Sequence, residues 1–375
     1  MRRDLERVEV PDAEAARERA HGVVVAAYGE REAIPVRRRP LRLAAVCAVL
    51  AVAAVVGAAF SPPGEAVVDR IREVIGVERA QPALFRLPTD GRLLVASDSG
   101  VWVVEQDGKK RLLPGYREAS WSPFGRFVVA TKANELAALE PDGDVRWTLA
   151  RRGVRFPRWT GTKSDTRIAY LTGRRLHVVA GDGTRDGDAG GLPDSQLVAP
   201  AWQPGKGFVL AYANRFGRIR TFAAGRGSDG WSDPAQSRPL SRTSALEWTS
   251  DGAQLLVAAH WRLLRFDARS GAPLNVQRVV GLQAIAVRPG SPQVALLRRP
   301  GEVSQVVVGG SVVFSCGCEL RGLMWSPDGN WLLVGSPEAD QWIFVRPETK
   351  RIVAVSNVSE QFRSRSFPRV EGWCC

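Results

Sequence analysis

The sequence predicts an all-β fold: a β-propeller of seven blades with about four antiparallel strands each, preceded by a single transmembrane helix and a short N-terminal helix. Three observations predict it. A turn element such as "WSPDG" lies between apolar runs, it recurs at spacings of 34 to 46 residues, and a charge-free apolar run precedes the first copy. Periods of about 40–45 residues with several short strands per unit are typical of propeller blades.

The repeat is clearest in "MWSPDGNWLLVG", residues 324–335. Proline fixes φ at the first corner of a turn, aspartate can bond its own backbone, and glycine supplies a positive φ, so the stretch predicts strand, tight turn and strand. The residue before the turn is large and apolar in every copy, and we expect it to wedge against the next blade. The seven copies place there Leu87, Trp121, Trp159, Trp202, Trp248, Val287 and Trp325.

The elements "WSPDG", "WSPFG" and "WTSDG" resemble the WD-like repeats of bacterial propellers, as in the periplasmic TolB-type proteins and the propellers that cap some serine oligopeptidases. The resemblance covers Leu84 to Val358. It departs from eukaryotic WD repeats, because the Gly-His start and the Trp-Asp end are missing. The resemblance implies a propeller but no particular function, since such blades serve as binding platforms, gates and scaffolds.

The C-terminal stretch "FPRVEGWCC" ends on a further motif-like tryptophan, Trp373. We expect this tail to pack at the seam between the first and last blades. Disulfides are expected to link one C-terminal cysteine to one of the earlier pair, and free thiols or a metal site are the alternatives. The candidate residues are Cys316, Cys318, Cys374 and Cys375.

The apolar run over residues 41–60 is long enough to cross a bilayer as a helix. Arginines stand directly before it, so the positive-inside rule places the N-terminus in the cytoplasm and the propeller, residues 84–375, outside the cell membrane. The expected localisation is therefore a single-pass membrane protein. A cleaved signal peptide is the alternative, although its polar lead of about forty residues would be long.

Two segments flank the expected span. Residues 1–40 form a cytoplasmic segment with one amphipathic helical pattern, which is too short for a core of its own and suggests a cytoplasmic partner. A disordered charged tail is the alternative. Residues 61–83 are expected to form a juxtamembrane helix or linker. This layout resembles membrane-tethered anti-sigma regulators, but the cysteines of their zinc motif are absent from the first 40 residues.

Composition and motifs argue against catalysis, metal binding and nucleic-acid binding. The net charge of +13 comes almost entirely from arginine, without the long basic runs that track phosphates, so nucleic acid is not an expected partner. None of His21, His177 and His260 has a second ligand or base at a motif spacing. The acidic loop "DGTRDGDAGG", residues 182–191, has Pro193 where a calcium loop needs an acid. We expect no enzyme activity, no cofactor and no metal.

The favoured function is a membrane-anchored, extracytoplasmic propeller that binds a protein or ligand as a scaffold in the bacterial cell envelope. Two alternatives remain: a transmembrane signalling regulator, and an enzyme that uses the central channel. Tryptophan is enriched where binding energy concentrates, so tryptophans outside the turn motif are candidate rim contacts, with blade packing as the alternative. These residues are Trp102, Trp231, Trp261 and Trp342.

Overall fold

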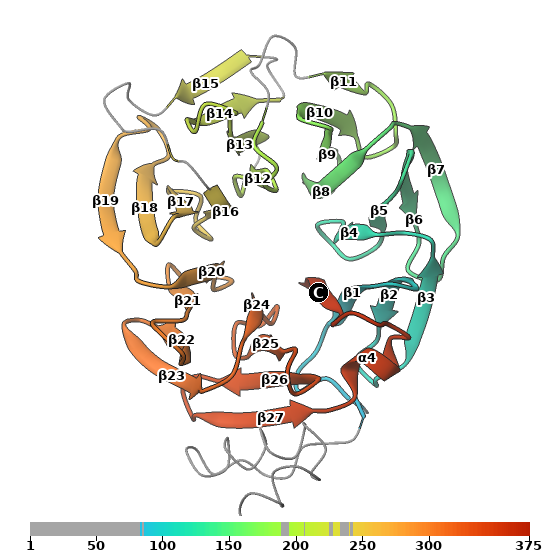
Figure 1. Ribbon diagram of the computed structural model, residues 1–375. Coiled ribbons are helices and arrows are strands. Elements are labelled where there is room, and N and C mark those ends of the chain that lie inside the picture. The colour runs from blue at the N-terminus through green and yellow to red at the C-terminus, as the bar shows by residue number, and fades with distance from the viewer. Residues whose placement is uncertain are drawn as a thin grey trace, which may run out of the picture. The chain divides into compact units, whose positions relative to one another are not determined.

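The computed structural model describes residues 83–84, 86–188, 195–205, 207–224, 228–232, 240 and 243–375, with only the backbone described for 228–232. Seven four-stranded sheets form within this part of the chain, and every strand pair in them is antiparallel. Figure 1 shows the sheets as the blades of a ring, with the first strand of each blade nearest the axis. The predicted β-propeller of seven blades is therefore confirmed.

The strands are named by blade, from the innermost to the outermost. Blade 1 contains β28 (Arg369–Cys374), β1 (Arg92–Ser97), β2 (Gly100–Val104) and β3 (Lys110–Pro114). Blade 2 contains β4 (Glu118–Trp121), β5 (Val128–Lys132), β6 (Glu135–Leu139) and β7 (Val145–Ala150). Blade 3 contains β8 (Val154–Gly161), β9 (Thr166–Thr172), β10 (Arg175–Ala180) and β11 (Gly187–Asp188). Blade 4 contains β12 (Ala201–Trp202), β13 (Val209–Ala213), β14 (Ile219–Ala223) and β15 (Ser228–Ser232).

The remaining three blades follow the same order. Blade 5 contains β16 (Thr243–Trp248), β17 (Gln254–Ala259), β18 (Arg262–Asp267) and β19 (Pro273–Arg278). Blade 6 contains β20 (Leu282–Val287), β21 (Val294–Arg298), β22 (Ser304–Val308) and β23 (Ser311–Cys316). Blade 7 contains β24 (Arg321–Trp325), β25 (Leu332–Ser336), β26 (Gln341–Arg346) and β27 (Arg351–Val355). Helix α4 (Val358–Gln361) connects blade 7 to β28.

The ring closes through the C-terminus. Strand β28 forms the innermost strand of blade 1 and pairs with β1, placing Trp373 opposite Leu93. The expected packing of the tail at the seam is confirmed. The first repeat needs a correction, however, because Trp373 and not Leu87 occupies the inner-strand position of blade 1. Leu87 precedes β1 and is buried, and its amide donates to the Gln106 carbonyl at 2.9 Å.

The repeated tryptophan joins neighbouring blades. The Trp202 indole nitrogen donates to the Arg158 carbonyl at 2.9 Å, Trp248 to Ala201 at 3.0 Å, and Trp325 to Ala286 at 3.1 Å. Each acceptor lies on the inner strand of the preceding blade, one residue before the equivalent motif position. In these three blades the indole therefore fills the gap between two sheets and also satisfies its buried N–H. The buried indole nitrogens of Trp121, Trp159 and Trp373 have no hydrogen-bond partner among the described residues.

The turn after the tryptophan is held by its own polar residues. The Ser326 hydroxyl accepts the Trp331 amide at 2.9 Å and donates to Asp328, which also accepts the Asn330 amide at 3.1 Å. Burial opposes the effect, but these hydrogen bonds lower the pKa of Asp328 to about 2. Thr249 and Asp251 form the same bond in blade 5, at 2.6 Å. The motif thus specifies the turn through side-chain caps.

The predicted fold class needs a second correction, because the described structure does not contain the transmembrane helix. Across the described ranges, no helix is long and apolar enough to cross a bilayer, and α4 is the one helix present. Apolar runs such as β25 and β26 instead form strands buried between blades. The helices expected over 1–40, 41–60 and 61–83 lie outside the described residues, apart from 83.

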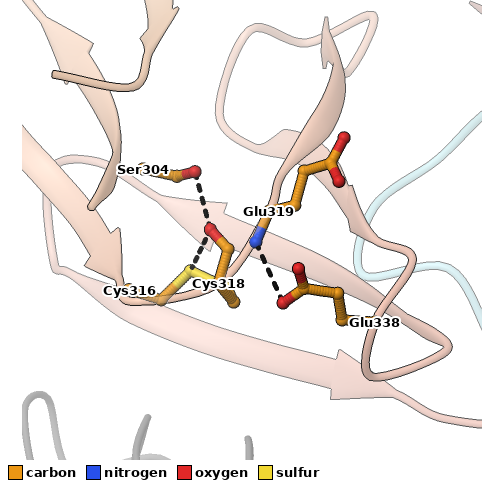
Figure 2. Close-up of a disulfide and its surroundings, with 5 residues drawn as sticks. All are labelled: Ser304, Cys316, Cys318, Glu319 and Glu338. Carbon is orange, nitrogen blue, oxygen red and sulfur yellow. Dashed lines mark hydrogen bonds between the residues drawn. A yellow bond between two sulfur atoms is a disulfide. The ribbon is translucent and has the colours of Figure 1, made fainter. Parts of the chain in front are cut away.

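The cysteines pair within each short motif. Cys316 bonds to Cys318 and Cys374 bonds to Cys375 (Figure 2 shows the first pair). The expected link between the two motifs is wrong, because Cys316 ends the outer strand of blade 6 whereas Cys374 ends the inner strand of blade 1. The Ser304 hydroxyl donates to the Cys318 carbonyl at 2.7 Å and fixes this turn.

Replacing Cys316 and Cys318 together by serine is expected to lower the free energy of unfolding by about 1.5 kcal/mol, because so short a loop restricts the unfolded chain little. Urea unfolding of the oxidised protein measures the difference, and the variant with serine at 374 and 375 is the control. A loss near the ~4 kcal/mol of a long closed loop would contradict the local pairing.

Candidate functional site

The structure separates the four tryptophans expected at the rim. Trp102 and Trp342 are buried and pack against Phe362 of α4's C-terminal side, so they are blade-packing residues. Trp261 is 49% exposed at the hairpin between β17 and β18. Trp231 lies in β15, but its side chain is outside the described residues. One expected rim contact therefore remains with an exposed indole.

The acidic loop and His177 are engaged in a local network of blade 3. Arg151 Nε donates to the Asp186 carboxylate at 2.9 Å, and the Tyr170 hydroxyl donates to it at 2.5 Å. Burial raises the pKa of Tyr170 and lowers the pKa of His177, whose ring stacks on Tyr170. Asp186 is thus bound by an arginine and a tyrosine, and this geometry is structural.

A groove between blades 2 and 3 offers the best binding geometry. Its volume is about 620 Å³. One wall comes from the turn of blade 2, with residues 122–124, Arg126 and Phe127. The other comes from blade 3, with Thr162, Lys163, Thr166, Gly181 and Asp182. Phe127 stacks on Trp159 across the two blades, with ring centroids 6.3 Å apart and planes 16° from parallel. Trp147 completes the aromatic lining and donates to the Gly181 carbonyl at 3.0 Å.

Phe124 distinguishes this groove from the equivalent turns of other blades. It occupies the fourth motif position, where Asp328 and Asp251 cap the equivalent turns. The Ser122 hydroxyl still accepts the Phe127 amide at 2.9 Å, so the turn forms without the carboxylate. The Phe124 ring is 55% exposed and lines the groove. The turn has thus lost a capping group and presents a large apolar surface to solvent.

The groove also carries positive charge. Arg126 lies over the Phe127 ring at 5.0 Å and Arg146 lies over the same ring at 5.9 Å. Arg146 is paired with Glu140, whereas Arg126 and Lys163 form no ion pair with any residue that the structure describes. Asp182 is the one acidic side chain in the described lining, and it accepts the Thr184 hydroxyl at 2.7 Å. The free cations therefore favour an anionic ligand.

Three carboxylates from different blades lie on inner strands, where a channel enzyme would need its catalytic groups. Two of them already bind the next blade: Glu118 accepts the Phe156 amide, and Glu247 accepts the Val287 amide at 3.3 Å. Glu371 accepts Arg369 of its own strand at 2.9 Å. The bonds of Glu118 and Glu247 join neighbouring inner strands, whereas the bond of Glu371 lies within β28.

Burial at the inner strands shifts the pKa of two of these acids. Burial raises the pKa of Glu247 to about 7, although the Val287 amide and the Arg158 charge act in the opposite direction. Burial also raises the pKa of Glu371, against the charges of Arg369 and Arg158. The charge of Arg158 on β8 thus lowers the pKa of both acids and partly offsets the effect of burial.

Sequence reasoning missed the groove, because it treated "WSPFG" only as another copy of the turn. The signal was present in Phe124, a large apolar residue at a turn position that the copies with Asp90, Asp251 and Asp328 fill with aspartate. Its neighbours could not be found from the sequence, since residues 122–127, Trp147, Trp159 and Lys163 meet only when two blades stand side by side.

No family model matches this chain, and no curated protein matches its sequence. Two of the similar solved structures reach a TM-score of 0.50 or more and support the fold. The propeller domain of Cps50 (Swd1) from Myceliophteria thermophila has 10% identity and a TM-score of 0.53, covering 65% of this chain and 86% of that one. KlHsv2 with loop 6CD replaced by a Gly-Ser linker has 10% identity and a TM-score of 0.50, covering 71% and 94%. The hydrazine synthase of Kuenenia stuttgartiensis has 14% identity and a TM-score of 0.49, covering 63% and 78%.

Proposed function

We propose that this propeller is a protein-binding module, not an enzyme, and that its groove between blades 2 and 3 holds an acidic segment of a partner protein. The exposure of Phe124 carries the proposal. Asp328 and Asp251 accept backbone amides and so cap the equivalent turns of other blades. The phenyl ring of Phe124 cannot accept such a bond and is exposed to solvent, so it does not stabilise its turn in this way. Exposed aromatic rings beside arginine are typical of binding surfaces.

The lining defines the ligand's chemistry. An aromatic or aliphatic side chain of the partner would pack on Phe124 and toward the Phe127–Trp159 stack. Flanking carboxylates would pair with Arg126 and Lys163, which form no ion pair with any described residue. Burial of the apolar side chain supplies affinity, and the charges supply orientation and on-rate. A scaffold role follows, in which the rigid ring positions the bound partner.

Replacing Phe124 by aspartate is expected to weaken binding of an acidic peptide with a central phenylalanine by at least ~10-fold, since about 1.4 kcal/mol of apolar contact and charge attraction is lost. The folded state should be as stable as the parent, because the introduced Asp can cap its turn as Asp328 does. Fluorescence anisotropy of the labelled peptide Glu-Glu-Phe-Glu-Glu measures binding.

Phe216 provides a matched control. It is 57% exposed and lies beside Arg215, whose guanidinium is 4.6 Å from the ring, but it belongs to the turn after β13. Phe216→Asp should leave the affinity unchanged. Equal affinity for the parent and for both variants would contradict the proposed groove, as would stronger binding of a lysine-flanked peptide.

The regulator alternative concerns residues 1–40, which lie outside the described residues, and it stays a prediction. It predicts a second partner that requires this segment. Cross-linking in cells with the full chain and with a chain lacking residues 1–40 measures that dependence. A partner lost only with the shorter chain would support it, and identical partners for both chains would exclude it.

A further inference from the structure

The outer edge of blade 5 is exposed along its whole length. All six residues of β19 are exposed, and the side chains of Leu274 and Val276 are each 52% accessible. The outer strands β3, β23 and β27 each bury at least one residue, whereas β7 buries none and both residues of β11 are exposed. Figure 1 shows β19 at the outside of its blade, where no further strand is paired with it. Its apolar side chains are therefore left without a covering element among the described residues.

An edge strand offers free backbone N–H and C=O groups, and proteins protect such edges with proline, bulges or charge. In β19, Pro273 and a register shift protect only the first residues. Asn275 to Arg278 pair regularly with Arg265 to Arg262 of β18. These residues of β19 therefore form a regular strand edge, with which another extended chain can pair.

Two arginines face each other across this edge. Arg262 on β18 lies directly opposite Arg278 on β19, and both are exposed. Like charges at directly opposite positions destabilise a sheet. Neither arginine has an ion-pair partner in the described chain. A carboxylate placed beside them would remove this repulsion.

The adjoining hairpin tip is strained. His260 and Trp261 form the two-residue turn between β17 and β18, with φ values of 40° and 62°. Asn-Gly is the favoured sequence for two consecutive residues with positive φ. Here two large rings occupy the turn, stacked with centroids 5.7 Å apart, and the indole is 49% exposed. The Val279 amide donates to the Trp261 carbonyl at 2.7 Å, so the tip is joined to the end of β19.

We propose that the edge formed by β19, Arg262 and Trp261 binds an extended acidic peptide segment, which adds to blade 5 as a fifth strand. Backbone hydrogen bonds to β19 would hold the segment, as in other strand additions. Its carboxylates would pair with Arg262 and Arg278, and its apolar side chains would cover Val276 and Trp261. This edge is separate from the groove between blades 2 and 3.

The test uses the full-length chain and the fluorescein-labelled peptide Thr-Val-Thr-Glu-Thr-Val-Thr-Glu, in which valine and glutamate alternate along one face, because Val276 and Arg278 lie on the same face of β19. Arg278→Glu should weaken its binding at least tenfold, because the new carboxylate pairs with Arg262 and repels the peptide. The double replacement His260→Asn with Trp261→Gly should also weaken binding while raising the melting temperature, because Asn-Gly relaxes the turn. If His260 and Trp261 served only folding, this double replacement would lower the melting temperature.

Controls separate this proposal from the groove. Phe124→Asp should leave binding of the alternating peptide unchanged, and Arg278→Glu should leave binding of Glu-Glu-Phe-Glu-Glu unchanged. Failure of the parent to bind the alternating peptide, or equal binding by Arg278→Glu, would overturn the proposal. A parent that is a dimer in analytical ultracentrifugation and a monomer after Arg278→Glu would also overturn it, since a second copy would then occupy the edge.

Discussion

Deletion of residues 369–375 is expected to unfold the propeller. The deletion removes β28, the inner strand of blade 1, and with it the buried Trp373 that packs with Phe344 of blade 7 at a centroid distance of 5.8 Å. Blade 1 then exposes β1, whose residues Leu93, Leu94 and Val95 are fully buried. Since most domains are stable by only about 5–15 kcal/mol, loss of this seam exceeds the margin.

Circular dichroism during heating measures the effect, and deletion of only Cys374 and Cys375 is the control. The shorter deletion keeps Arg369–Trp373 paired with β1 and is expected to lower the melting temperature by only a few degrees, as for a change of about 1 kcal/mol. A cooperative transition near that of the parent after deletion of residues 369–375 would show that β28 is dispensable for closure.

Glu247→Gln is expected to stabilise the protein at pH 8 by roughly 3 kcal/mol and to have little effect at pH 4. Burial raises the pKa of Glu247 in the folded state to about 7, from an ordinary value of 4.5. Between pH 4.5 and about pH 7, the carboxyl of Glu247 in the folded state keeps a proton that the same group releases in the unfolded chain. Stability is therefore full below pH 4.5 and is lost as the pH rises toward 7 and above, by about 1.4 kcal/mol per pKa unit.

The glutamine removes this titration but keeps an oxygen that can accept the Val287 amide, as the carboxylate does at 3.3 Å. Urea unfolding from pH 4 to pH 8 measures the effect, and Glu302→Gln, at an exposed loop position, is the control. The parent and the control should lose stability over this range, whereas Glu247→Gln should lose less. A variant less stable than the parent at pH 8 would show that the ionised carboxylate stabilises the inner strands.

The two proposed binding surfaces have a common physical basis. At Phe124 and at His260–Trp261, the chain departs from residues that would satisfy the local turn, and in both places an exposed aromatic residue is followed within two positions by an arginine, Arg126 or Arg262. Sequences that fold well agree with their local structure, so departures of this kind concentrate at functional sites. The equivalent turns at Asp328 and Asp251 show that aspartate, the stabilising alternative to Phe124, occurs at this turn position elsewhere in the chain.

The sequence by itself determined the repeat architecture. The Trp-Ser-Pro-Asp-Gly pattern acts within a few residues, because Ser326 and Asp328 cap a turn whose Gly329 has a φ of 68°. Local rules of this kind act before any tertiary contact, so seven copies predicted seven blades. Trp373 also predicted the closing strand, since it repeats the large residue that ends the inner strands. The transmembrane helix predicted with them is not part of the described structure.

Tertiary structure alone decided the surfaces and the covalent links. Trp102 and Trp261 look alike in the sequence, yet the first packs against Phe362 and the second stands at a hairpin tip, because α4 returns across blade 1. The expected disulfide between the two cysteine motifs does not form, because Cys316 and Cys374 end strands of different blades, and the groove arose from two adjacent blades. These features depend on contacts between residues far apart in the chain, and a local pattern carries no information about such distances.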